Sequence, residues 1–144
     1  LNASEKHPQT ILQARFETII NNTSVTCICD AIVFVDPNMI DLYEIKAGTR
    51  VKQENFFDLA FQKAIIESCG FDLRDIYVIN ANSKYVRRGD IDVNEFCYET
   101  NVNEEVDELK DFTFEQIGLA GKCIKRKTPY RCHSQNKTKQ ETLQ

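Results

Sequence analysis

Three ionisable side chains near the start of the sequence could do chemistry together: Asp30, Glu44 and Lys46. Asp30 is the only charge in the apolar stretch 24–35, where an acid needs an ion pair, a hydrogen bond or a bound cation. Glu44 and Lys46 lie two positions apart, so a strand would place both on one face, about 6.5 to 7 Å apart. Two carboxylates with a backbone carbonyl between them suit Mg²⁺ or Mn²⁺. The lysine could then assist the attacking water or neutralise a phosphate, which predicts hydrolysis of a phosphodiester.

A plain structural explanation competes with this one. Glu-x-Lys is frequent in charged sequences, and a strand with a surface salt bridge would account for Glu44 and Lys46. The acid inside an apolar strand favours the chemical interpretation. Gln62 is a fourth candidate, because Asp58 lies one helical turn before it and the pair would direct a polar strip towards the end of the sheet.

Hydrophobic patterns predict the elements that must position these groups. Between residues 10 and 20 the even positions Leu12, Ala14, Phe16 and Ile20 are apolar, which is the period of a half-buried strand. Asn21-Asn22 then favours a left-handed turn and a hairpin. The predicted elements are strands 10–20, 24–35, 39–47 and 75–82 and a crossover helix 53–69. Together they predict an α/β fold with a mixed sheet.

The helix and the acidic segment after the last strand complete the prediction. Gly70 is a natural cap for helix 53–69. Its expected apolar stripe consists of Phe57, Phe61, Ala64, Ile65 and Ser68. Residues 96–102 predict a short edge strand, and the acids between 90 and 115 predict a solvated helix face.

Composition indicates one domain without a membrane-spanning segment. The chain has 144 residues, 42% hydrophobic and 28% charged, and lacks a long apolar run. A net charge of −4 argues against coating nucleic acid through bulk positive charge, so any phosphate contacts must be local. We expect a core over residues 10–120 and a basic, loosely ordered tail over 121–144. The opening Leu1 and the absence of an apolar signal segment predict either an excised piece of a longer protein or a processed product.

The quoted residues resemble those of the PD-(D/E)XK nucleases, in their RecB-like branch. Asp30 matches the first acid, Glu44-Ile45-Lys46 the (D/E)-x-K element and Gln62 the glutamine of the helix. The resemblance extends to a bacterial RecB-like subfamily through segments 44–52, 58–62 and 85–92. It implies a restriction-endonuclease-like fold in which Asp30, Glu44 and the Ile45 carbonyl bind Mg²⁺ or Mn²⁺ and Lys46 assists the water.

Two departures from the family pattern limit what this resemblance implies. The family usually has a helix before its first strand, and residues 1–9 are too few to form it. The branch often has tyrosine four residues after the glutamine, where this chain has Ile66. This fragment could therefore be inactive by itself.

The six cysteines allow several interpretations. Cys27 and Cys29 fit packing as small hydrophobes. Cys123 and Cys132 look like the start of the cysteine group that holds an iron–sulfur cluster in many relatives, but four thiolates are normally required. We expect no cluster in this fragment. Zinc bound through Cys132-His133 and a secreted, disulfide-bonded domain are weaker alternatives, and we expect a cytoplasmic location.

The substrate prediction depends on loop cations. Arg50 and Lys52 follow the third strand, and Arg87 and Arg88 follow the fourth, where they could bind phosphates or be simple solvated charges. We expect nucleic acid, DNA in preference to RNA, and other domains of a longer chain as partners, and no membrane. The rival hypothesis is a non-catalytic module that binds nucleic acid or protein within a larger repair or defence protein.

Overall fold

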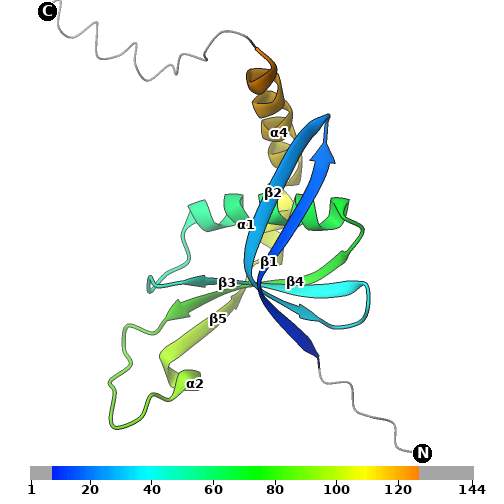
Figure 1. Ribbon diagram of the computed structural model, residues 1–144. Helices are drawn as coiled ribbons and strands as arrows, with labels where there is room; N and C mark the ends of the chain where they lie inside the picture. The colour runs from blue at the N-terminus through cyan, green and yellow to red at the C-terminus, as the bar shows by residue number, and fades with distance from the viewer. Residues whose placement is uncertain (1–7, 127–144) are drawn as a thin grey trace, which may run out of the picture.

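The computed structural model describes residues 8–126, whose strands form one mixed sheet in the order β1-β2-β3-β4-β5 (Figure 1). β1, β2 and β3 pair in antiparallel fashion, β4 lies parallel to β3, and β5 is antiparallel to β4. This confirms the predicted α/β class. The elements are β1 (Gln9–Ile20), β2 (Thr23–Phe34), β3 (Met39–Lys46), α1 (Gln53–Ser68), β4 (Asp72–Ala81), α2 (Val93–Phe96), β5 (Cys97–Asn101), α3 (Asn103–Glu108) and α4 (Lys110–Lys125).

Strands β1 and β2 form a long hairpin with a two-residue turn. Asn21 and Asn22 have φ angles of 50° and 58°, the left-handed conformation that asparagine tolerates and that matches the twist of a hairpin. The predicted turn is therefore confirmed. Figure 1 shows the far half of this hairpin extending beyond the rest of the sheet, beside α4.

The alternation of inward- and outward-facing side chains shifts by one residue in both hairpin strands, at Gln13 of β1 and at the facing position of β2. Ile11 faces the core and so does Ala14, although three positions separate them, because Gln13 between them has a φ of 53°. Residue 30 lies opposite residue 13 in the hairpin register. Leu12 consequently points away from the core with 68% of its surface exposed. The predicted inward position of Leu12 is wrong, since simple alternation assumes an undistorted strand.

The crossover from β3 to β4 runs through α1, which covers one face of the sheet. The helix begins where the Asn55 side chain accepts a hydrogen bond from the Lys52 N–H at 2.8 Å. It ends before Gly70, whose φ of 94° suits the expected cap. Leu59 and Ile66 of this helix are fully buried in the core.

The expected apolar stripe of the helix is wrong in part. Ala64 and Ile65 are buried, but Phe57 is exposed and Phe61 only half-buried. Those two rings lie on the flank of α1 that borders a cavity shared with α4. The stripe was misplaced because α4, the second surface that α1 packs against, was not predicted.

Strand β4 begins three residues earlier than expected. Three of its first four residues are charged, which weakens the strand pattern. Arg74 compensates for this by donating two hydrogen bonds to the buried Asp41 of β3, from Nε at 2.9 Å and Nη2 at 2.5 Å. A bidentate arginine–carboxylate pair of this kind joins the two strands at their starts.

The chain after β5 forms α3 and α4, so the predicted loose tail begins too early. Residues 121–125 belong to α4, which packs against α1 and β2, whereas residues 127–144 lie outside the described part. Two glycines at 118 and 121 lower the helix propensity of this segment and obscured it in the sequence. Gly121 lies against the start of β2, where a Cβ atom would come within 2.0 Å of Thr23 Oγ1.

This contact predicts opposite effects for two alanine substitutions in one helix. Gly121→Ala should lower the free energy of unfolding by about 1–3 kcal/mol, because the new methyl group overlaps the short Thr23 side chain. Gly118→Ala is the matched control, since its nearest neighbour outside the adjoining helix backbone would be Asn21 Nδ2, at 3.8 Å from the new Cβ. The control should gain up to about 1 kcal/mol from helix propensity. Urea unfolding measures both, and equal stabilities of the two variants would contradict the packing of α4 on the hairpin.

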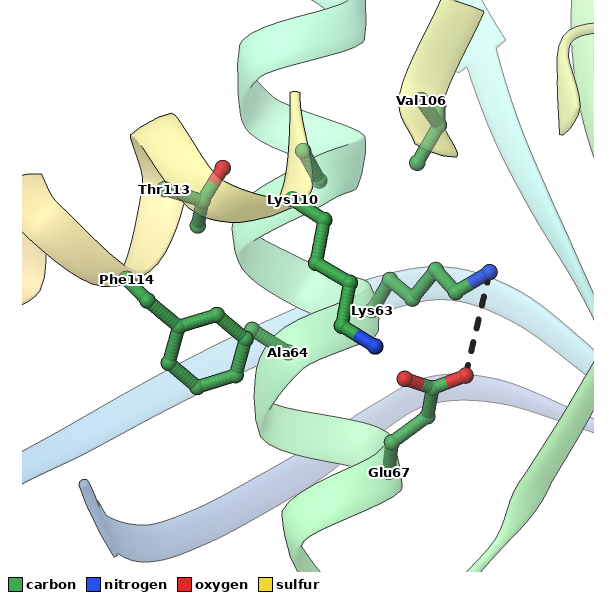
Figure 2. A pocket seen from close by; sticks show the side chains of 8 residues that line it. Lys63, Ala64, Glu67, Val106, Lys110, Thr113 and Phe114 are labelled. Carbon is green, nitrogen blue, oxygen red and sulfur yellow. Dashed lines mark ion pairs between the residues drawn. The ribbon is translucent and has the colours of Figure 1, made fainter. Parts of the chain in front are cut away.

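Helices α1 and α4 pack closely on the side of α1 that carries Lys63 and Glu67. Lys63 pairs with Glu67 at 3.7 Å and with Asp107 of α3 at 2.5 Å, and the remaining cavity of about 10 Å³ holds at most one water (Figure 2). The pair with Asp107 links α1 to α3 within the helical layer. None of the helices within residues 8–126 combines the length and apolar content required to cross a membrane.

Candidate functional site

Glu44 is the centre of the site, and it contacts two of the other predicted residues. Its side chain is 6% exposed and lies on the face of β3 that α1 covers. Lys46 Nζ lies 2.6 Å from Glu44 Oε1, which confirms that the two side chains share a face. From α1, Gln62 Nε2 donates a hydrogen bond to Glu44 Oε2 at 3.3 Å. Both carboxylate oxygens are therefore held, one by each neighbour.

Asp30 lies at the point where β2 and β3 separate. The pairing of these strands stops at Ala31↔Tyr43, and Asp30 Oδ2 then accepts a hydrogen bond from the Ile45 N–H at 2.8 Å. The N–H and C=O of one strand residue leave the same edge, so the Ile45 carbonyl also faces this separation. Gln13 Nε2 approaches Asp30 Oδ1 at 3.5 Å. Asp30 is half-buried, so the predicted deeply buried acid is Glu44 and not Asp30.

The charges around Lys46 are predominantly negative. The hydrogen bond with Glu44 raises the pKa of Lys46, burial opposes this, and the charges of Asp58 and Asp30 raise it further. The side chain is therefore an ammonium at neutral pH. Glu44 contacts this ammonium and the charges of Asp58 and Asp30 also act on it, an excess of negative charge that would attract a cation.

Gln62 carries an unsatisfied atom beside this cluster. Its Oε1 is buried and has no hydrogen-bond partner, a rare condition for a polar atom in a folded protein. Within residues 8–126 no three His, Cys, Asp or Glu side chains form a metal-binding group. Any cation here would rest on two carboxylates and neutral oxygens.

The four predicted substrate-binding cations are exposed and lie on two loops. Arg50 and Lys52 lie between β3 and α1, and Arg87 and Arg88 lie after β4. The first loop contacts the end of β4, where the Gly48 carbonyl accepts hydrogen bonds from the Ala81 N–H and the Asn80 side chain, at 3.1 and 3.2 Å. Arg87 Nε already donates to the Gly89 carbonyl at 2.7 Å. Phosphate binding by these residues stays a prediction.

The described cysteines are all free thiols. Cys27 and Cys29 are buried on the inner face of β2, and the hydrogen bond that the Cys29 thiol donates to Cys27, together with burial, raises the pKa of Cys29. Cys29 is therefore a neutral thiol that packs as a small hydrophobe. Cys123 lies half-buried on α4, while Cys132 falls outside the described residues, so the cluster prediction stays untested.

Sequence reasoning missed two polar residues at the site. Gln13 contacts Asp30, but only its positive φ reveals that it sits at a strand distortion. Asn80 is buried beside Lys46 in the β3–β4 register and anchors the Gly48 loop. A polar residue in the apolar run 76–81 was a usable signal for Asn80, because buried amides need partners.

Comparison with known proteins assigns this chain to no family, so its class is defined by its architecture alone. No protein-family model matches the sequence, and neither a curated protein nor a solved structure is significantly similar to it. The fold and site define an α/β protein with a five-stranded mixed sheet and a polar cluster where its hairpin leaves β3.

Proposed function

We propose that this chain is a divalent-metal-dependent nuclease of the PD-(D/E)XK type, with Asp30, Glu44, Lys46 and Gln62 as its site. One observation carries the proposal. Four groups from three elements are linked near the end of β3: Glu44 contacts Lys46 and Gln62, and Asp30 accepts a hydrogen bond from the N–H of the residue between Glu44 and Lys46. The antiparallel β1–β2–β3 followed by a helical crossover to a parallel β4 fits a restriction-endonuclease-like sheet.

The residues present fit a Mg²⁺ or Mn²⁺ ion. Asp30, Glu44 and the Ile45 carbonyl would hold it, since all three offer the hard oxygen ligands that these ions prefer. The excess of carboxylates over cations and the unsatisfied Gln62 Oε1 both favour a cation or an ordered water at this point. Bound there, the ion would supply Lewis-acid stabilisation of phosphate charge and a lower pKa for water.

The chain's own residues would orient and stabilise the reacting groups. The Lys46 ammonium, fixed by Glu44, would donate a hydrogen bond to the attacking water or to a phosphate oxygen as negative charge develops. Gln62 would position Glu44 through its hydrogen bond to Oε2. Water attack on phosphorus would then break one P–O bond of the nucleic-acid backbone.

Cleavage of single- and double-stranded DNA and RNA oligonucleotides with Mg²⁺, Mn²⁺ or EDTA tests this function. We expect Mn²⁺- or Mg²⁺-stimulated cleavage that EDTA abolishes and that the Asp30→Asn variant lacks. The Asp107→Asn variant is the control, because it also removes one carboxylate, from an exposed ion pair with Lys63. Absence of cleavage under every condition, or equal activity in Asp30→Asn, would contradict the catalytic proposal.

A second candidate is the non-catalytic binding module. It is favoured by the sheet face opposite α1, where Tyr43 and Tyr77 stack with ring centroids 5.1 Å apart and Ile45 is 55% exposed. An apolar face of this kind marks docking surfaces in other proteins. This candidate predicts that neither Mg²⁺ nor Mn²⁺ binds at millimolar concentration.

A further inference from the structure

A cavity opens on the flank of α1 opposite the Lys63 ion pairs. It has a volume of about 490 Å³, within the range of roughly 300–1,000 Å³ that is typical of small-molecule sites. The α1–α4 seam is therefore closed on one side (Figure 2) and open on the other. The lining residues are Phe57, Phe61, Phe112, Thr113, Gln116, Ile117 and Ala120.

The lining is aromatic and carries no charge. Phe57 and Phe112 face each other across the seam with ring centroids 5.4 Å apart at 58°, and they are 39% and 44% exposed. Phe61 is half-buried beside them, and Gln116 adds an exposed amide. Exposed rings with one amide suit a flat, neutral heterocycle, which stacks on a ring and forms hydrogen bonds through its edge.

Helix α1 connects the cavity with the site, because it carries both the Phe57 and Phe61 rings of the lining and the Gln62 side chain that contacts Glu44. Asp58 lies close enough to Lys46 for its charge to act on the ammonium. Phe61 follows Asp58 by three positions and is its neighbour on the helix surface. One flank of α1 therefore leads from the Lys46 ammonium over Asp58 to the phenylalanine rings.

We propose that this cavity binds one unpaired nucleobase of the strand whose phosphodiester lies at Lys46. The inference rests on the proposed nuclease function and adds a substrate class to it, namely single-stranded or locally unpaired nucleic acid. An uncharged lining cannot hold a phosphate, so the phosphates would follow the basic loops while one base enters the cavity. A paired base could not do so, because its face is stacked and its edge is occupied.

Kinetics with Mn²⁺ on a single-stranded oligonucleotide test the proposal. The double variant Phe57→Leu/Phe112→Leu keeps the apolar packing but removes both aromatic faces, and it should raise KM about tenfold with kcat little changed. Tyr98→Ala is the control, because Tyr98 is an exposed aromatic residue on β5 and does not line the cavity. An abasic nucleotide next to the cleaved bond should raise the KM of the wild type by the same factor. It should not raise the KM of the double variant any further.

Two outcomes separate this inference from the proposed function. Cleavage with an unchanged KM in the double variant, or an abasic penalty that persists in it, would overturn the base site and leave the nuclease intact. If the wild type cleaves nothing, the nuclease proposal fails, and binding decides the base site. The metal-free wild type should then still quench the fluorescence of an oligonucleotide that contains 2-aminopurine, and the double variant should quench it less. Equal quenching by the two proteins would overturn the inference.

Discussion

Replacing Lys46 by alanine is expected to lower Mn²⁺-stimulated cleavage by about 10²–10³-fold, the typical loss when one positioned donor is removed from a developing negative charge. Lys46 is the only cation in contact with Glu44 among residues 8–126. Its pKa is raised by that hydrogen bond, so the lost group is a charged donor at neutral pH. Initial rates at saturating substrate measure the effect.

Lys63→Ala is the matched control for Lys46→Ala. Lys63 lies on α1 and also forms ion pairs, with Glu67 and Asp107, but it does not line the cavity beside Phe57. It should keep wild-type cleavage. Circular dichroism should show both variants folded. Lys46→Ala activity equal to that of Lys63→Ala would contradict the assignment of Lys46.

Ile65→Ala is expected to lower the free energy of unfolding by about 2–5 kcal/mol. Ile65 is fully buried in the core on α1, the helix that also carries Asp58 and Gln62. Truncation leaves a cavity that a close-packed core cannot fill. Chemical denaturation followed by fluorescence or circular dichroism measures the change.

The same substitution at an exposed site provides the comparison. Ile19→Ala removes the same atoms from the outer face of the hairpin, where Ile19 is 71% exposed. Its effect should stay within about 0.5 kcal/mol. Similar losses for the two variants would show that α1 does not bury Ile65 against the sheet.

Local patterns were sufficient to predict the elements that hold the site. Asn21-Asn22 specified the hairpin turn, and Glu44 and Lys46 share a face because side chains alternate along a strand. Gln62 lies on the helix that follows β3, and its amide contacts Glu44. These relations depend on short spacings, which sequence periodicity captures well.

Other features depend on contacts between distant segments. The hydrogen bond from the Ile45 N–H to Asp30 requires the strands to separate, and the alternation pattern carries no sign of this. α4 was not predicted because its two glycines lower helix propensity, although Gly121 is needed for close approach to Thr23. The cavity beside Phe57 was missed for the same reason, since α4 forms its other wall.

Calorimetric titration of the metal-free protein with Mn²⁺ tests the central claim most directly, because the proposal requires Asp30 and Glu44 to hold one cation between them. We expect saturable binding in the wild type and in Asp107→Asn, and loss of that binding in Asp30→Asn. No binding at millimolar Mn²⁺, or undiminished binding in Asp30→Asn, would contradict the account.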